Sequence, residues 1–492
     1  MNDALPLLPL VVADVPASLR RMLMQEGVPQ RRASDAPTAG RFVLYDSRRR
    51  RSPQLTPDQT AIDVDDLRRV LGGDPFAEAE VVAARRTAWR VGPWTATEET
   101  AARERGLLRR RCLEALRGAV ERAGGVWARV AAVPHPYRTA FSFRFDHDAY
   151  DADDFHAVLA AVAGRETATT HFVCAATHER HPEALARLRG LDVGSHGYRH
   201  HAYLAADENR RNIRRGIEVL QRAGLQPCGY AAPHGRFHPA LPSILRALGV
   251  PYGSEFGLAY DDLPFAPDDV DDVRAAAIAP LQIPIHPVCL GIVFEALSVD
   301  DRGDPRSRDR VAEQVARYFI DVATAKHARG EPIFLYGHPD GRLGRHPEVL
   351  RRLFAAVERM SGVWWTNFSE FDRWWRRRAL VDVRVEPSDA GWTVTSDRLP
   401  DRETPAIEIE TADGIVRAPL AAGPMAVRNV VDERRSTTDA PWPRPVGCVD
   451  ATLRERVRRW IDWERTTPLD DIPRRPLRNR IKRALRRWEE PA

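Results

Sequence analysis

The chain has 492 residues, which is too long for one ordinary hydrophobic core and predicts two or three domains. Apolar residues make up 43%, a share that excludes wholesale disorder, and no apolar run approaches the about 18 residues that span a bilayer. With 74 basic against 69 acidic residues the net charge is only +5, so nothing in the overall charge calls for nucleic acid as a partner.

The cysteines and the first residues bear on location. Five cysteines are scattered, odd in number and without zinc-finger spacing, so a reducing, cytoplasmic location is the simplest interpretation. The apolar opening, residues 5–13, predicts a buried strand. An export signal is the alternative, but the basic segment that such a signal needs is missing.

Residues 1–130 predict an α/β segment of unassigned role. The runs 41–46 and 60–64 have the composition of strands. Thr95 and Glu98 have the spacing of a capping box, which predicts that a helix begins there. That helix would link this segment to the next, with an apolar face formed by Leu108, Cys112, Leu116 and Val120.

Residues 131–378 alternate strand-like and helical runs, which predicts a parallel sheet, and the number of units suggests a barrel of seven or eight strands. The strand candidates are 139–146, 170–176, 191–196, 228–235, 281–287, 332–339 and 363–368.

The last part of the chain changes character. Residues 379–440 alternate apolar and polar positions and predict a small antiparallel β domain. Residues 441–492 predict a basic helical tail, in which an amphipathic helix spans 477–488. Such a helix either packs on its own protein or lies on an anionic membrane surface, so peripheral membrane contact stays open.

The first candidate site is Asp146 and Asp148 at the end of an apolar strand, where barrel enzymes place their active sites. Two carboxylates two residues apart on an extended chain leave from the same side. They repel unless a cation or a shared proton lies between them. The pair favours a metal ligand beside a general base, and a plain loop or helix cap is the alternative.

Four further features stand at or near predicted strand ends. His196 and His200 are four residues apart, a spacing at which two histidines on one helical face can chelate one ion. A turn contains Pro233, His234 and Gly235. His286 and His338 are single histidines, which are more often structural than chemical when they stand alone.

Taken together, residues 138–375 resemble the polysaccharide deacetylase family, also called carbohydrate esterase family four. The family's Asp-x-Asp motif is matched by Asp146 and Asp148, and its HxxxH motif by His196 and His200. Its R-x-P-x-G turn is matched at 231–235 except for the first residue. Its late strand with a catalytic histidine is matched by His338.

The resemblance implies a distorted (β/α) barrel that hydrolyses an N-acetyl group on an amino sugar or glycan. Asp148, His196 and His200 would hold one divalent metal ion, with Zn²⁺ expected first, although this ligand set suits other divalent metals. Asp146 would act as the base and His338 as the acid that protonates the leaving amine.

Two residues depart from the family pattern. Gly197 stands where the family has Ser or Thr, and Ala231 stands where an Arg orients the catalytic Asp. Two arginines lie near enough in sequence to replace that Arg. Arg144 leaves the same face of the strand as Asp146, and Arg236 follows the turn. We favour Arg144, because a strand fixes the direction of its side chains.

Three other functions stay open from the sequence. An iron oxygenase uses the same ligand set. A hydrolase of a small cyclic amide would use the same chemistry and occurs among relatives of the family. A degenerate barrel that only binds glycans would explain Ala231. The oligomeric state is also left open.

Overall fold

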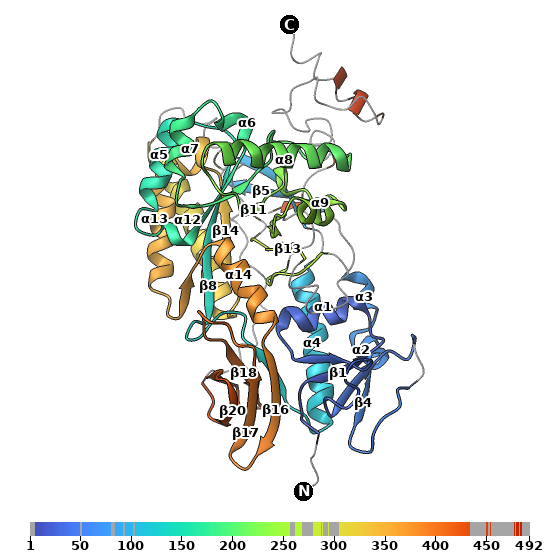
Figure 1. Cartoon of the computed structure of the whole chain (residues 1–492). Coiled ribbons are helices and arrows are strands. Elements are labelled where there is room, and N and C mark those ends of the chain that lie inside the picture. Colours follow the sequence, from blue (N-terminus) through green and yellow to red (C-terminus); the bar gives the residue numbers. More distant parts are fainter. Residues whose placement is uncertain are drawn as a thin grey trace.

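Short strands between residues 139 and 365 form one parallel sheet (Figure 1). They are β8 (Thr139–His147), β9 (Thr169–Val173), β10 (Asp192–Ser195), β11 (Gly229–Tyr230), β12 (Tyr252–Gly253), β13 (Leu281–Gln282), β14 (Ile333–Gly337) and β15 (Val363–Trp365). Their order is β13-β12-β11-β10-β9-β8-β14, with β15 also beside β8. The His286 N–H donates to the Phe334 carbonyl at 2.7 Å, which brings the two edges of the sheet together. The predicted α/β fold class, a distorted (β/α) barrel, is confirmed.

These coordinates come from a computed structural model. It describes residues 5–49, 52–79, 84–91, 94–101, 104–255, 261–267, 279–286, 288, 294, 305–432, 449–450, 453, 477, 479–481 and 483–484.

Helices cover the outside of the barrel. They are α5 (Ala152–Ala161), α6 (Ala175–His178), α7 (Pro182–Arg187), α8 (Ala206–Arg222), α9 (Leu241–Ala247), α12 (Pro305–Ala328), α13 (Pro347–Glu358) and α14 (Phe368–Ala379). Side-chain caps set where two of them begin. Asp151 accepts the Asp154 N–H before α5, and Asn367 accepts the Glu370 N–H before α14. Such caps satisfy backbone donors that the first helical turn leaves without a partner.

β8 explains how the barrel carries polar groups. All nine of its residues are buried, and successive side chains alternate between its two faces. Phe141, Phe143 and Phe145 pack with apolar residues of α12 and α13. Arg144 and Asp146 therefore leave from the other face, toward the inside of the barrel. β12 escaped prediction because two residues carry no periodic pattern.

The N-terminal segment forms a parallel sheet in the order β2-β1-β3-β4, from β1 (Leu10–Ala13), β2 (Gln30–Arg32), β3 (Phe42–Tyr45) and β4 (Thr60–Asp63). Its helices are α1 (Ala17–Glu26), α2 (Val64–Leu71), α3 (Pro75–Glu78) and α4 (Arg105–Arg122). The predicted strands at 41–46 and 60–64 are present. The capping-box prediction was wrong, because Trp94–Ala101 is strand β6, paired with β5 (Ala84–Val91) along its length. α4 begins after that hairpin.

The C-terminal strands are antiparallel, as predicted. They are β16 (Asp382–Ser388), β17 (Gly391–Asp397), β18 (Ala406–Glu410), β19 (Ile415–Pro419), β20 (Gly423–Arg428) and β21 (Val449–Asp450). β16, β17 and β20 form one sheet, and β21 pairs with β5. β18 pairs on one side with β19 and on the other with β7 (Trp127–Val130), which precedes the barrel in the chain.

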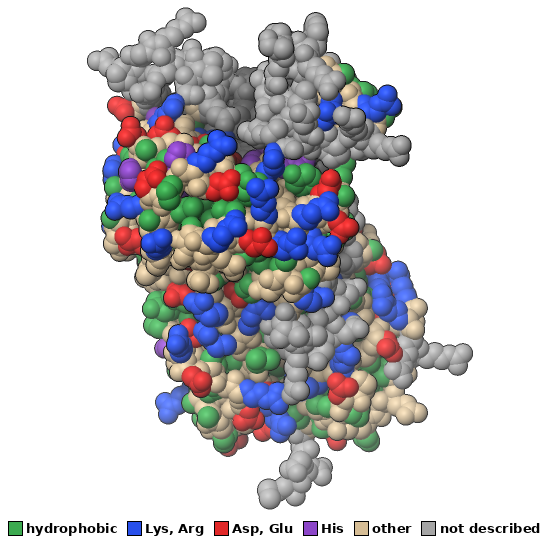
Figure 2. Space-filling model, turned by 45° about the horizontal axis from the view of Figure 1, so that its top comes forward, with side chains coloured by type: hydrophobic (Ala, Val, Ile, Leu, Met, Phe, Trp, Pro, Cys, Tyr) green, Lys and Arg blue, Asp and Glu red, His purple; other side chains and the backbone are tan. Residues whose placement is uncertain are grey.

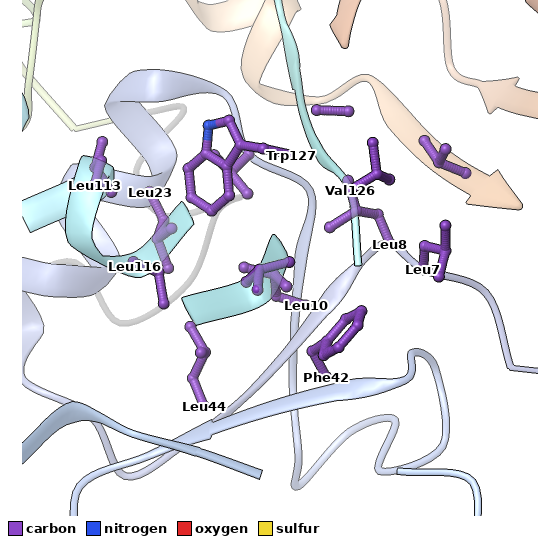
Figure 3. Packing of buried hydrophobic residues seen from close by; sticks show 14 of the residues in the cluster. Leu7, Leu8, Leu10, Leu23, Phe42, Leu44, Leu113, Leu116, Val126 and Trp127 are labelled. Atoms are coloured by element: carbon purple, nitrogen blue, oxygen red, sulfur yellow. The ribbon is translucent and has the colours of Figure 1, made fainter. Parts of the chain in front are cut away.

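One apolar core joins the N-terminal segment to these strands. Leu10, Phe42 and Trp127 belong to the same buried cluster as Val385 and Ile407. Figure 3 shows the packing of Leu10, Phe42 and Trp127. The boundaries at 130, 378 and 440 stay a prediction. The pairing of β7 with β18 and the shared apolar core both join residues 1–130 to residues 379–440.

The surface and the tail add two facts. On the face that Figure 2 turns forward, the visible Lys and Arg side chains are interspersed with Asp and Glu. None of the helices in the described ranges is both long and apolar enough to cross a bilayer. Residues 478, 482 and 485–488 of the predicted tail helix at 477–488 lie outside the described residues, and those described within it are helical.

Candidate metal centre and active site

Arg144 and Asp146 form a buried pair inside the barrel. Arg144 Nε donates to Asp146 Oδ1 and Nη2 to Asp146 Oδ2, each at 2.6 Å. This bidentate contact is the hydrogen bond predicted from the strand alternation, and it is confirmed. His147, between the two aspartates, leaves from the opposite face and lies 2.9 Å from the His171 ring.

The surroundings of Arg144 fix its guanidinium in place. Nη1 donates to the Ser254 carbonyl at 2.6 Å and contacts Ser254 Oγ at 3.0 Å. The guanidinium lies over the rings of Phe172 and Tyr336. Burial alone would lower the pKa of Arg144, but the Asp146 carboxylate outweighs it and raises that pKa. Burial would raise the pKa of Asp146, but the Arg144 charge outweighs burial and lowers that pKa, so both groups are charged at neutral pH.

The HxxxH segment is a bent loop after β10, so its predicted helical geometry was wrong. Asn212 of α8 holds the bend. Its amide accepts the Arg199 N–H at 2.8 Å and donates to the Arg199 carbonyl at 3.0 Å. Gly197 has φ of 83°, and a Cβ there would lie 2.7 Å from the Asn212 amide. Glycine at this position therefore suits the bend.

The loop nevertheless brings the two histidines to Asp148. His196 Nε2 lies 3.2 Å and His200 Nε2 lies 3.3 Å from Asp148 Oδ1, and one ligand atom from each residue falls within 4.8 Å of the others. Two ligand atoms that each lie about 2.1 Å from one ion are separated by roughly 3.0–3.4 Å at ordinary coordination angles. The three residues therefore fit a divalent ion.

His338 follows β14 and joins the same cluster. Its Nε2 lies 3.4 Å from Asp148 Oδ2. Burial, with a smaller contribution from Arg342, lowers the pKa of His338 to about 3, so its ring is neutral at neutral pH. Burial would raise the pKa of Asp148, but the nearby His200 and His338 bring it well below the usual range. Metal binding needs an ionised carboxylate, and the lowered pKa of Asp148 supplies one.

The turn after β11 packs against the candidate metal ligand His200. Pro233 and Gly235 are buried in a short 3-10 turn, and His234 has φ of 57°. The His234 and His200 rings lie edge to face, with centroids 4.5 Å apart. Arg236 follows the turn, but both oxygens of Asp146 accept from Arg144 instead.

His286 does not join the site. Its Nε2 lies 2.8 Å from the Tyr318 hydroxyl of α12. Burial lowers the pKa of His286 to about 3, and the charges that also act on it are those of Lys326 and Asp262. The position of His286 near a predicted strand end did not place it in the site. The segment after β13 reaches the beginning of β14, whereas the cluster with His338 lies where β14 ends.

Sequence reasoning missed three residues near the centre. Ser254 and Glu255 follow β12, the strand that was not predicted, and lie behind Arg144. Asp340 follows His338, and burial together with the Asp148 charge raises its pKa. Asp340 had a usable signal, since it stands two residues after a candidate histidine. Ser254 and Glu255 belong to no motif.

Comparisons with known proteins cover the part of the chain that carries this cluster. Residues 139–253, from β8 to β12, match the family model for polysaccharide deacetylase. No curated protein matches the chain. Similar solved structures include proteins assigned as polysaccharide deacetylases from Mycobacterium smegmatis (22% identity, 50% of this chain and 93% of that chain, TM-score 0.37) and Pseudomonas aeruginosa PAO1 (19%, 49% and 92%, TM-score 0.40). The PuuE allantoinase is also similar (18%, 49% and 92%, TM-score 0.37).

The fold and the cluster define the class of this protein as a (β/α) barrel with a His-His-Asp centre at the carboxyl ends of its strands. Within that class, residues 139–253 are similar to the polysaccharide deacetylase family, whose model they match.

Proposed function

We propose that this chain is a metal-dependent hydrolase that removes an N-acetyl group from an amino sugar or glycan. One observation carries the proposal. The ligand atoms of Asp148, His196 and His200 lie within 4.8 Å of one another, in the same strand-end cluster as the arginine-held carboxylate of Asp146. The family match supports a deacetylase, and this donor set beside a second carboxylate supports hydrolysis.

Asp146 is the proposed base. Arg144 holds both of its oxygens, so the carboxylate keeps one orientation and stays ionised. A divalent ion, with Zn²⁺ expected first, would polarise the acyl carbonyl and lower the pKa of a water at the centre. Asp146 would accept the proton of the water that attacks the carbonyl carbon.

His338 is the proposed acid. An amine leaves poorly as an anion, so the nitrogen must gain a proton before the C–N bond breaks. Because burial keeps His338 neutral at rest, it must receive a proton during turnover before it can donate one. His338→Ala should slow amide substrates more than activated esters, whose leaving groups need no acid. Equal losses on both substrates would remove His338 from this role.

The decisive experiment is acetate release from a panel of N-acetylated amino sugars and glycans, with and without a chelator. Chelator-sensitive release supports the proposal. A panel that also holds small cyclic amides distinguishes the second candidate, a hydrolase of another non-peptide C–N bond. Strict dependence on oxoglutarate would point to an oxygenase instead.

A glycan-binding barrel without activity is the remaining alternative. Its motive was Ala231, which cannot hold the catalytic carboxylate as the family Arg does. Arg144 supplies that contact from β8, so Ala231 no longer speaks against catalysis. Glycan binding without any acetate release would favour this alternative.

A further inference from the structure

We propose that Glu255 is a positioning residue that couples the metal ligand His196 to the base Asp146. The proposal rests on the proposed function, because it assigns Glu255 to the same centre. Glu255 follows β12, is 3% exposed and belongs to no catalytic motif. Its side chain acts on the metal ligand His196, and its backbone belongs to the segment that supports the base Asp146.

The carboxylate acts on His196 through one peptide group. Glu255 Oε1 accepts the Ala232 N–H at 3.1 Å, and the carbonyl of the same peptide, on Ala231, lies 2.8 Å from His196 Nδ1. A carbonyl only accepts, so Nδ1 of His196 carries the proton and Nε2 keeps its lone pair. Nε2 is the atom that lies 3.2 Å from Asp148. The contact thereby fixes the tautomer that a metal ligand needs.

The chain of contacts also makes His196 a stronger ligand. When Glu255 is ionised, its negative oxygen on the Ala232 N–H polarises that peptide, and the Ala231 carbonyl then accepts more strongly from His196. Carboxylates commonly orient and activate metal-bound histidines by a direct hydrogen bond. Here a peptide group stands between Glu255 and His196 and transmits the same effect.

The backbone of Glu255 belongs to the support of the base. The peptide between Ser254 and Glu255 presents its carbonyl to Arg144 Nη1 at 2.6 Å, and the same guanidinium holds Asp146. Ser254 Oγ, which also contacts Arg144, donates to the Ile283 carbonyl at 2.8 Å. A shift of the segment after β12 would therefore move Arg144, and with it Asp146.

A third contact keeps the Glu255 carboxylate in position. With the Gln282 amide nitrogen facing it, Glu255 Oε2 accepts a hydrogen bond of 2.7 Å from β13. Burial raises the pKa of Glu255 to about 7, against the opposing charge of Arg144 and the Ala232 N–H. A carboxylate buried this deeply is costly unless its hydrogen bonds are satisfied, and here each oxygen has a donor.

The test is Glu255→Gln, which keeps the size of the side chain and an oxygen for the Ala232 N–H but removes the charge. We expect Zn²⁺ affinity, measured by chelator competition, to fall about tenfold, at the low end of the effect of outer-shell changes. Turnover should fall with it, while the unfolding midpoint of the metal-free protein stays close to that of wild type. A merely structural role would change the midpoint and leave Zn²⁺ affinity alone.

Glu331→Gln is the matched control. Glu331 is also a buried glutamate whose pKa burial raises to about 7, but it pairs with Lys326 and Arg110 and makes no contact with the Asp148 cluster among the described contacts. Its Zn²⁺ affinity should equal that of wild type. Equal affinity in Glu255→Gln and in the control would overturn the inference. A wild-type protein that binds no Zn²⁺ would overturn the proposed metal centre and this inference together.

Discussion

Two buried polar clusters occupy different parts of this protein, and each contains a glutamate whose pKa burial raises to about 7. One is the centre at the carboxyl ends of the strands, with Glu255. The other lies where α4 meets the barrel, with Glu331, Asp262 and Arg110. A buried acid with a shifted pKa is thus no sufficient sign of a functional site.

What separates the two clusters is how their charges are paired. Around α4, each cation contacts carboxylates: Arg109 lies 3.3 Å from Asp261, and Arg110 pairs with Asp262 and lies 3.0 Å from Glu331. At the strand ends Arg144 pairs with Asp146, and the ion-pair contacts of Asp148 within the described part of the chain are with histidines. Imidazole nitrogens beside a carboxylate can offer lone pairs to a cation, whereas Arg and Lys side chains carry only donors.

The largest expected effect is the loss of the metal. His196→Ala or His200→Ala should weaken Zn²⁺ binding by more than the about 100-fold that outer-shell changes reach, because a ligand itself is removed. Chelator competition measures the affinity. The control is His286→Ala, which removes a buried histidine bonded to Tyr318, away from Asp148. If His286→Ala weakened Zn²⁺ binding to a comparable extent, Zn²⁺ binding would not be specific to the histidines beside Asp148.

Asp146→Asn should come next. The metal ligands stay in place, but an amide cannot accept the proton, so turnover should fall about 10²-fold or more while Zn²⁺ affinity changes little. Acetate release and metal content are measured on the same preparation. Turnover near the wild-type rate would show that another group is the base.

A smaller effect is expected from moving the arginine. Arg144 lies over Phe172 and Tyr336, and Ala231 packs in the same apolar cluster as these two rings. Arg144→Ala should lower turnover about tenfold or more, since a bidentate contact to the base is lost. The double variant that adds Ala231→Arg restores the family's residue. It should recover part of the lost turnover, because the new guanidinium can fill the space that the Arg144 side chain occupied.

Two single variants complete that experiment. Ala231→Arg alone should destabilise the protein, because two guanidinium groups would compete for one buried site. Arg236→Gln should leave turnover near wild type. A strong loss in Arg236→Gln together with full activity in Arg144→Ala would assign the positioning role to Arg236.

The smallest expected effect is on stability at the α4 cluster. Burial and the Asp262 charge raise the pKa of Glu331 from 4.5 to about 7, so the folded state keeps a proton that the unfolded chain releases. The free energy of unfolding should therefore fall as pH rises from about 4.5 to 7, by roughly 1–2 kcal/mol from this group. Glu331→Gln should flatten this slope in urea unfolding, without a change in Zn²⁺ affinity. Glu255 contributes a slope of the same sign, so some of it remains. An unchanged slope in Glu331→Gln would show that Glu331 does not titrate in this window.

The sequence predictions that were confirmed rest on local patterns. Asp146 and Asp148 follow a strand whose apolar residues alternate, so both the strand and the side from which Arg144 leaves could be predicted. The HxxxH spacing brought two histidines to Asp148 even though the helix assumed for it is a loop. The spacing identified the residues, while Asn212 on another helix decided their geometry.

The features that the sequence did not predict depend on long-range packing. The pairing of β7 with β18, and the core shared by the first and last parts of the chain, depend on segments that lie far apart in sequence. Glu255 escaped notice because β12 is two residues long and its partners come from β11 and β13.

The sequence by itself determined the barrel, the Asp-His-His set and the arginine that holds Asp146, because each is written in strand alternation or a short motif. Only the tertiary structure decided that His286 lies apart from the site and that Glu255 lies behind it. Both depend on how segments after β12 and β13 cross the barrel, and that path is set by contacts with other strands and helices, which leave no periodic trace in the residues themselves.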